Sequence, residues 1–348
     1  MADSRVVLHG DQLDAPLEPE ALLDFSCAEK WGDGLPIIAP TPERVMRMIE
    51  GAGRSGDTVV SALQPGGNVA TVEKIAINAV MAGCKPAYMP VLIAITDALG
   101  DPEFNTRGVQ VTTNPVAVAA IVNGPIRHAL ELNCRRGCLG PGWRANATIG
   151  RAIRLILINI GGAIPADVDK AVHGFAGKFS LCFGEDEEGS PWAPLHVERG
   201  YDKDTSTVTI CSVQDTSNSL TLSGEDSETF LRLAAYAMAT PGSNNLLCGG
   251  GQPILLLTRG HAQMLATAGF SKADCRAYLF EHGVVHQSAV GEAIWPGRPF
   301  QPTPEGMLRP VKRPEDYMIL VAGGDEPYHH QVMHTFGEDS QAITRVIS

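Results

Sequence analysis

The sequence has no apolar run long enough to cross a bilayer. Its most apolar stretch, RAIRLILINIGGAI, is short and is interrupted by Arg154 and Asn159. The first twenty residues are acidic and lack the apolar core of a secretory signal. We therefore expect a cytoplasmic protein with no membrane partner.

A basic stripe is also missing. The chain carries 27 Lys and Arg against 39 Asp and Glu, which gives a net charge of -12 at pH 7. Proteins that bind nucleic acids usually gather cations on one face or along one helix. We therefore expect no nucleic-acid partner, and the acidic balance by itself does not identify a substrate.

The common cofactor motifs are absent as well. The chain contains neither the G-x-G-x-x-G fingerprint of dinucleotide sites nor a Walker loop, so nicotinamide redox chemistry is disfavoured and no cofactor is identified. Its eight cysteines, spread over 348 residues, are not the disulfide framework of a small secreted domain. We expect most of them to be buried and to pack as small hydrophobic residues.

Short apolar strands alternate with helical patterns along the chain. AVAAIVN, PILLLT and YMILVAGG are typical of buried strands, and amphipathic helices lie between them. We expect an α/β fold of two intimately packed α/β lobes with mixed or largely parallel sheets, and a homo-oligomer. Residues 1–212 would form the N-terminal lobe with a glycine-rich anion-binding segment, and 213–348 the C-terminal lobe. No internal repeat is visible in the sequence.

Several element boundaries follow from capping residues. Thr41 and Gly51 should bound one helix, and the stretch GVQVTT should form a strand. Ser223 or Asp226 should cap the helix that follows residue 226.

A second set of boundaries comes from residues 71–83 and from residue 271 onward. Thr71 and Gly83 should bound a helix, and Ser271 with Asp274 fits the capping-box pattern of another.

The stretch LNCRRGCLGPGWRANATIGRA, residues 132–152, is rich in glycine and arginine immediately before a helix. A helix N-terminus attracts anions, and glycine lets the backbone approach a ligand closely. We therefore predict that Gly140, Gly142, Arg144 and Asn146 bind the anionic group of a substrate. The alternative is a tight turn whose arginines are solvated.

The cysteines of this stretch are weaker candidates. Cys134 and Cys138 have C-x3-C spacing with no second ligand pair, so a structural zinc site is disfavoured. Elsewhere, Cys182 ends a strand that leads into an acidic loop, and Cys84 follows a helix end. Both are candidate nucleophiles, and both also fit buried packing.

VNGPIRH follows an apparent strand, and ligands gather at strand carboxyl ends in α/β sheets. Asn123 and Arg127 are therefore predicted to bind substrate. The alternative is a plain turn, because Asn-Gly-Pro is strong turn chemistry by itself.

The segment GEDEEGSPWAPLHVERG, residues 184–200, is the other dense polar stretch. Glu185, Glu187 and His196 are predicted to move protons, while Trp192 and Arg199 are predicted to contact substrate. The segment also fits a solvated acidic loop, or a site for a hard metal.

A separate metal alternative comes from YHHQVMH near the end of the chain. His330 and His334 have i, i+4 spacing, which would place two ligands on one face if this segment were helical.

Several of these segments together resemble a known family. WGDGLPIIAPTPERV, TVEKIAINAVMAGC, LGPGWRANATIGRAIRLILINIGG and SPWAPLHVERG are similar to a poorly characterised bacterial family over roughly residues 31–340. Genes of that family lie beside, or are fused to, short proteins with a selenocysteine-Gly-Ser-Cys (UGSC) motif. The resemblance implies an enzyme or enzyme subunit, and thiol or selenol chemistry with a redox partner protein.

The present chain departs from that pattern in one respect, because it has no selenocysteine-Gly-Ser-Cys or C-G-S-C stretch of its own. It would then be the substrate-binding part. In the family, the positions matching Cys134 and Cys138 need not be cysteine, which leaves the Gly-Pro-Gly turn, Arg144 and Asn146 as the stronger candidates.

Taken together, the patterns predict an enzyme that acts on a small anionic organic substrate by lyase- or hydrolase-type chemistry. His196 or a glutamate would move protons, with a cysteine as a candidate nucleophile. Three alternatives stay open: the substrate-binding subunit of a thiol- or selenol-dependent reductase, a metal-dependent enzyme using His and carboxylates, and a non-catalytic binding protein.

Overall fold

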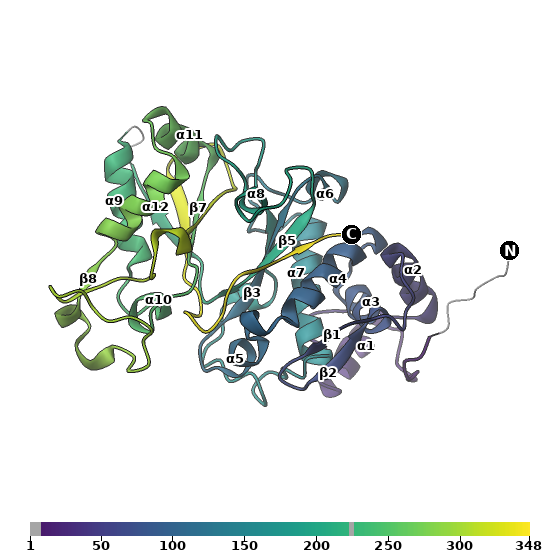
Figure 1. The fold of residues 1–348 in the computed structure, drawn as a ribbon. Helices are drawn as coiled ribbons and strands as arrows, with labels where there is room; N and C mark the ends of the chain where they lie inside the picture. Colours follow the sequence, from purple (N-terminus) through teal and green to yellow (C-terminus); the bar gives the residue numbers. More distant parts are fainter. Residues whose placement is uncertain (1–7, 223–225) are drawn as a thin grey trace.

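The computed structural model describes residues 8–222 and 226–348. Two four-stranded sheets lie side by side, each flanked by helices (Figure 1). Each sheet contains parallel and antiparallel strand pairs, so the predicted α/β fold with mixed sheets is confirmed. Neither sheet is largely parallel.

The first sheet is centred on β3 (Ala117–Asn123). This strand pairs in parallel with β4 (Cys182–Gly184) and antiparallel with β5 (Thr207–Val213). The last strand of the chain, β12 (Ile343–Val346), adds antiparallel to β5 as the edge. All seven residues of β3 and of β5 are buried, as expected for strands covered on both faces.

The second sheet repeats this pattern. Its central strand β7 (Ile254–Leu257) pairs in parallel with β10 (Met318–Val321) and antiparallel with β11 (His329–Met333). Its edge strand is β6 (Ser217–Leu220), which is antiparallel to β11. In chain order β3, β4, β5 and β6 therefore correspond to β7, β10, β11 and β12, and each half gives its fourth strand to the other half's sheet.

The two connections cross at one point. Val213, at the end of β5, lies opposite Thr335, just after β11. On one side of this pair the Gln214 amide donates to the His334 carbonyl at 2.9 Å, and on the other the Phe336 amide donates to the Ser212 carbonyl at 3.0 Å. Two matching hydrogen bonds around one residue pair are the arrangement that a local two-fold axis produces.

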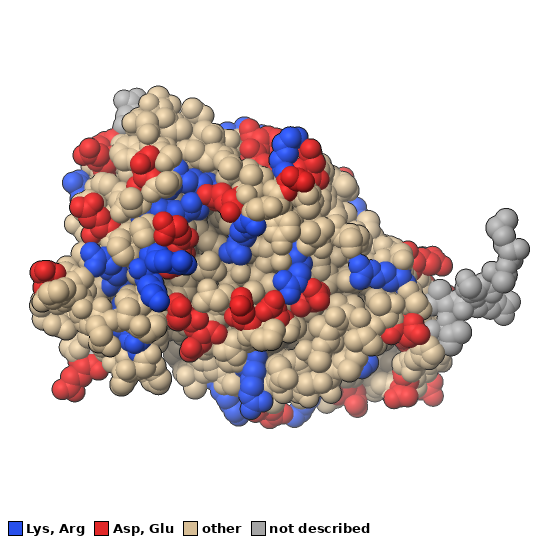
Figure 2. Space-filling model, viewed as in Figure 1, with Lys and Arg blue, Asp and Glu red and all other residues tan. Residues whose placement is uncertain are grey.

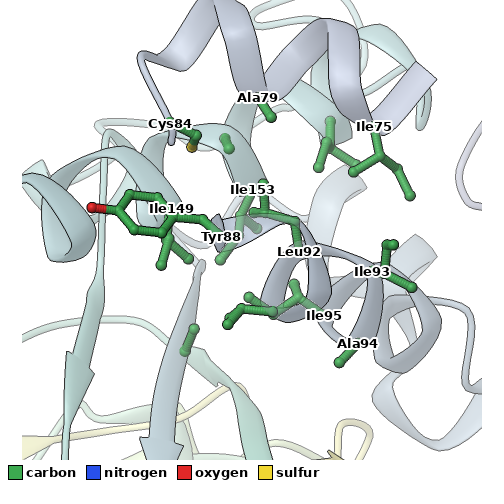
Figure 3. Packing of buried hydrophobic residues seen from close by; sticks show 14 of the residues in the cluster. Ile75, Ala79, Cys84, Tyr88, Leu92, Ile93, Ala94, Ile95, Ile149 and Ile153 are labelled. Carbon is green, nitrogen blue, oxygen red and sulfur yellow. The ribbon is translucent and has the colours of Figure 1, made fainter. Parts of the chain in front are cut away.

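The largest core lies beside the first sheet. The helices α3 (Val72–Ala82), α4 (Met89–Leu99) and α7 (Arg144–Asn159) pack together there. Figure 3 shows Ile75 and Ala79 of α3, Leu92 and Ile95 of α4, and Ile149 and Ile153 of α7 meeting in this core. Ile149 and Ile153 thus lie on the buried face of α7.

The second sheet is covered by α9 (Ser227–Met238), α11 (Arg259–Thr267) and α12 (Lys272–His282). The remaining elements are α1 (Pro19–Ala28), α2 (Pro42–Ala52), β1 (Val59–Leu63), β2 (Asn68–Thr71), α5 (Thr106–Val111), α6 (Ile126–Ala129), α8 (Leu195–Glu198), α10 (Asn244–Leu247), β8 (Val285–His286) and β9 (Met307–Leu308). None of the helices described combines the length and apolar character needed to span a bilayer.

Most of the capping predictions are confirmed. The Thr71 hydroxyl accepts from the Lys74 amide at the start of α3, and Gly83 ends that helix at φ 90°. Ser271 and Asp274 form the predicted capping box of α12. Asp226 caps α9, whereas Ser223 lies outside the described residues.

Three local predictions are wrong. GVQVTT falls mostly in the helix α5, because the Asn105 side chain caps it by accepting from the Gly108 amide. The helix α2 runs past Gly51 to a left-handed Gly53, since Gly51 is needed for close packing against Pro86. YHHQVMH contains the strand β11 and no helix.

The predicted division at residue 212 falls at the end of β5, close to the strand crossing. Residues 343–346 return to the first sheet, so the two halves exchange strands. The position of a domain boundary stays a prediction.

The crossing should contribute measurably to stability. Asp215, beside it, accepts from the His334 amide at 3.1 Å and contacts His334 Nδ1 at 2.9 Å. Replacing Asp215 by Ala leaves buried donors of His334 without a partner, so we expect the free energy of unfolding to fall by about 1–3 kcal/mol. Urea unfolding measures it. Asp202→Ala, at an exposed loop position, is the matched control, and an equal loss in both variants would contradict this role.

Candidate functional site

The carboxyl ends of both parallel strand pairs meet between the sheets. The Asp186 amide, just past β4, donates to the Val321 carbonyl at the end of β10 at 2.7 Å. The Gly323 amide, just past β10, donates to the Cys134 carbonyl at 3.0 Å. Because strand carboxyl ends are where open α/β sheets place ligands, this seam is the first place to examine for a site.

Four side chains form a connected group there, which we call the strand-end cluster: Asn123, Glu185, Glu187 and His196. Asn123 Nδ2 donates to Glu185 Oε2 at 2.7 Å and to Glu187 Oε1 at 3.0 Å. Glu187 Oε1 also accepts from the Gly124 amide at 2.7 Å and lies 3.9 Å from His196 Nδ1. The sequence predicted all four residues from two separate segments, and the structure brings them together.

Arg127 packs beside this cluster and is 2 % exposed. Its Nη2 lies 3.0 Å from Glu187 Oε2 and 2.9 Å from Glu188 Oε1. Its Nη1 donates to the Glu185 carbonyl at 2.6 Å. The guanidinium is therefore already paired with two carboxylates and holds the loop after β4 in place.

His196 is fully buried, and its two ring nitrogens differ in their surroundings. Nε2 lies 3.2 Å from the Lys203 carbonyl oxygen, whereas Nδ1 has no hydrogen-bond partner. Since a carbonyl only accepts, Nε2 carries the hydrogen in the tautomer that fits this contact. The lone pair of Nδ1 is then free on the side of Glu187.

Three further buried atoms near His196 also lack partners among the described residues: Asn123 Oδ1, Glu185 Oε1 and Thr207 Oγ1. Thr207 lies directly opposite Asn123 in the β3–β5 ladder. Buried polar atoms are nearly always hydrogen-bonded, and each one left unpaired costs free energy. These atoms lie around the carboxyl ends of β3 and β4, and Glu185 Oε1 has only Lys272 Nζ nearby, at 3.8 Å.

Glu185 and Glu188 differ in their tendency to hold a proton. Burial raises the pKa of Glu185 above its usual range, against the lowering effects of Lys272 and its hydrogen bonds. Burial acts in the same direction on Glu188, but hydrogen bonds from Arg127 and His128 outweigh it and lower the pKa of Glu188 to about 2. Glu185 therefore tends to keep its proton, whereas Glu188 is ionised at neutral pH.

Lys272 was missed by sequence reasoning. At the start of α12 it is only 5 % exposed, and its Nζ donates to the Ala193 carbonyl at 2.7 Å and to Glu198 Oε2 at 2.9 Å. It also lies 3.8 Å from Glu185 Oε1. A lysine at the first position of a helix gives no sequence signal of burial, so only the fold reveals it.

The other predicted substrate-binding residues of the loop act as anchors. Trp192 Nε1 donates to the Phe270 carbonyl at 3.2 Å, and Arg199 Nη1 donates to the Ala342 carbonyl at 3.0 Å. Both contacts tie residues 185–206 to neighbouring segments. Neither side chain has a hydrogen bond to the strand-end cluster.

The predicted anion-binding residues of the glycine-rich stretch have no hydrogen bond to the strand-end cluster, although Cys134 of the same stretch lies 3.8 Å from Arg127 Nη1. Gly140, Gly142 and Arg144 are exposed, and Arg144 Nε donates to the Gly83 carbonyl at 3.0 Å. Asn146 is buried, and its amide bonds to Asn133 and to the Cys138 carbonyl. The arrangement fits the alternative of a tight turn, in which Asn146 pins the loop.

The two candidate cysteines are held in apolar surroundings. Burial raises the pKa of the Cys84 thiol to about 12, and it also raises the pKa of Cys182 well above its usual range. The thiolate is the reactive form, and burial of this kind suppresses it. Burial therefore disfavours the reactive thiolate form of both cysteines.

The histidines of the second sheet fall into two separate sets. His334 Nδ1 contacts Asp215 and its Nε2 contacts the Ala237 carbonyl, whereas the His330 ring lies 5.8 Å from that of His261. The alternative of a metal pair on one helix face does not hold, because His330 lies in the strand β11 and His334 directly follows that strand. Over residues 8–222 and 226–348, no group of three or more His, Cys, Asp or Glu side chains is arranged to hold a metal ion.

Acidic and basic side chains are interspersed on the face of the molecule shown in Figure 2. Neither sign forms a broad patch there, so this face offers no strong field of one sign. Comparison with protein-family models, with curated proteins and with solved structures found no match to this chain. The site must therefore be interpreted from its own geometry.

The buried His261 and His330 should make stability depend on pH. Burial, with the neighbouring histidines, lowers the pKa of His261 to about 3, and burial with His329 lowers that of His330 to about 4. The unfolded chain takes up protons below about pH 6.5 and the folded chain does not. Stability is therefore full above pH 6.5 and falls toward pH 4, by up to about 1.4 kcal/mol per pH unit for each histidine.

Urea unfolding at a series of pH values measures this dependence. His330→Gln should flatten the slope, whereas His282→Gln, at an exposed histidine of α12, should leave it unchanged. The same slope in both variants would show that other groups control acid unfolding.

Proposed function

We propose that this protein is an enzyme that transfers protons to and from a small organic substrate at the strand-end cluster, by lyase- or hydrolase-type chemistry. The observation that carries the proposal is the set of four unpartnered buried atoms, on Asn123, Glu185, His196 and Thr207. A substrate that bonds to these atoms would recover the free energy their burial costs.

His196 is the proposed general base. Its Nδ1 has a free lone pair, and Glu187 Oε1 lies 3.9 Å away. When Nδ1 accepts a proton from substrate, the positive ring faces the negative carboxylate of Glu187, which stabilises the protonated form. The Lys203 carbonyl at Nε2 keeps the ring oriented throughout.

Glu185 is the proposed general acid. Burial favours its protonated form, and Oε1 is the oxygen without a partner, while Oε2 accepts from Asn123 Nδ2 and from the Leu195 amide. A protonated carboxyl at Oε1 can donate to a leaving group. A protonated carboxyl beside a histidine with a free lone pair is a usual division of acid and base roles.

Asn123 and Arg127 position these groups. Asn123 holds both glutamates through Nδ2, which leaves its Oδ1 free to accept from a hydroxyl or amino group of the substrate. Arg127 fixes Glu187 and Glu188 through ion pairs. That guanidinium is already neutralised by the two carboxylates. These contacts therefore do not explain why a substrate would be anionic, and the anionic character of the substrate stays a prediction.

The alternative of a substrate-binding reductase subunit stays a prediction too. It requires a thiol or selenol partner protein, and no contact among residues 8–222 and 226–348 favours one. Homo-oligomer formation and a cytoplasmic location likewise stay predictions.

A proton-exchange screen tests the proposal without a known product. Hydroxy acids, amino acids and their amides are incubated with the protein in D2O and followed by NMR for loss of C–H signals or cleavage. His196→Gln keeps a donor for the Lys203 carbonyl but removes the base, and Glu185→Gln removes the acid. Each should lower the rate by about 10²–10⁴-fold.

His128→Gln is the matched control, because His128 is exposed on the same side and contacts only Glu188. It should leave the rate within a few-fold of the wild type. Exchange that survives in His196→Gln, or no conversion of any compound by the wild type, would contradict the proposed site.

A further inference from the structure

A cavity lies near the amino end of β3, opposite the end that carries Asn123. It has a volume of about 740 Å³ and is lined by the carboxyl-terminal half of α7, by residues 164–179 and by residues 30–34. A narrow hollow that shares Arg154 and Lys178 with it reaches Val116, at the amino end of β3. The cavity is therefore far from Asn123, and its size suits a small organic ligand.

Three charged side chains form one wall of this cavity. Asp169 Oδ2 lies 2.9 Å from Arg154 Nη2 and 2.7 Å from Lys178 Nζ. The side chains of Arg154, Lys178 and Asp169 are 10 %, 13 % and 5 % exposed. Two cations thus share one carboxylate, which leaves one buried positive charge without an opposite charge.

The other charges around the cavity do not balance this excess. Asp33 is paired with Arg151 at 2.7 Å, and the exposed Lys30 is paired with Asp167 at 2.9 Å. Each of these pairs is neutral by itself. A buried unpaired charge is costly, and burial accordingly lowers the pKa of both Arg154 and Lys178.

Lys178 also has hydrogen-bonding capacity to spare. An ammonium group has three N–H donors, and Asp169 is its one partner among the described residues. Arg154 in contrast is held in place by Gln110 Oε1 at 3.1 Å and by the Ala163 carbonyl at 3.3 Å. The wall therefore combines a fixed guanidinium with a lysine that can bond to a further acceptor.

The remaining walls are largely apolar. Their apolar residues include Ile158, Ile164, Pro165, Phe175 and Phe179, and Lys30, Asp33 and His173 also line the cavity. Phe179 is 52 % exposed, so its ring can contact an apolar group of a ligand in the cavity.

We propose that this cavity binds a small organic carboxylate, with its carboxylate group against Lys178 and Arg154 and its apolar body against Ile158 and Phe179. The ligand supplies the negative charge that the wall lacks. The proposal is independent of the acid–base site, because the two lie at opposite ends of β3.

Calorimetric titration of the full chain tests it with benzoate and hexanoate as probes. At least one should bind with a Kd of about 1 mM or tighter, while the neutral benzamide and hexanamide should bind at least tenfold more weakly. Lys178→Gln should weaken carboxylate binding at least tenfold. Lys170→Gln is the matched control, since Lys170 is an exposed lysine of the same segment that bonds to the Ala166 carbonyl.

Phe179→Ala provides a second readout, because this exposed ring can be removed without opening the core. It should weaken the binding of benzoate and hexanoate, whose apolar bodies would contact this ring. The binding of acetate, which has a single methyl group, should stay unaffected. The proposal is overturned if neither probe binds, if the amides bind as well as the carboxylates, or if Lys178→Gln and Lys170→Gln bind them alike.

Discussion

The antiparallel crossing at Val213 and Thr335 is the constraint on which the rest of the structure depends. Each half of the chain ends by adding its fourth strand to the other half's sheet, so neither sheet is complete without both halves. Because one local two-fold relates the halves there, the carboxyl ends of β4 and β10 approach one another, and backbone hydrogen bonds join them. The close approach of these two strand ends thus follows from the strand exchange.

The two halves differ where the cluster lies. Glu185 and Ala322 occupy matching positions, because the amide of each donates to the strand beside it, at Val122 and at Leu257. After Glu185 the chain runs through residues 185–206 before β5, whereas only residues 322–328 separate β10 from β11. Three of the four cluster residues, Glu185, Glu187 and His196, therefore come from the segment that differs between the halves, while Asn123 comes from β3. Burying these polar groups costs stability, and that cost is one reason for the role proposed above.

Sequence patterns predicted much of the local structure that has a local cause, with the helix α5, capped by Asn105, as an exception. The caps at Thr71 and Ser271 and the buried strands β3, β7 and β10 depend on neighbouring residues. Strand exchange was invisible, because it leaves no sequence repeat and depends on pairing between β5 and β12, far apart in the chain. The burial of Lys272 depends in the same way on a distant carboxylate, so composition around it carried no signal.

The predicted anion-binding residues and the charged wall of the cavity differ in their exposure to solvent. Gly140, Gly142 and Arg144 offer the right groups at a helix start, but they are exposed, and charge interactions in water are weak. Arg154 and Lys178 have no motif around them, yet they are buried with one shared carboxylate. In a wall of low dielectric constant, each interaction with an entering anion is stronger. Leaving the buried cations without an anion also costs more free energy there. The proposed carboxylate site therefore lies where the chain has already removed water, beside Arg154 of α7 and Lys178, rather than at the exposed first turn of α7.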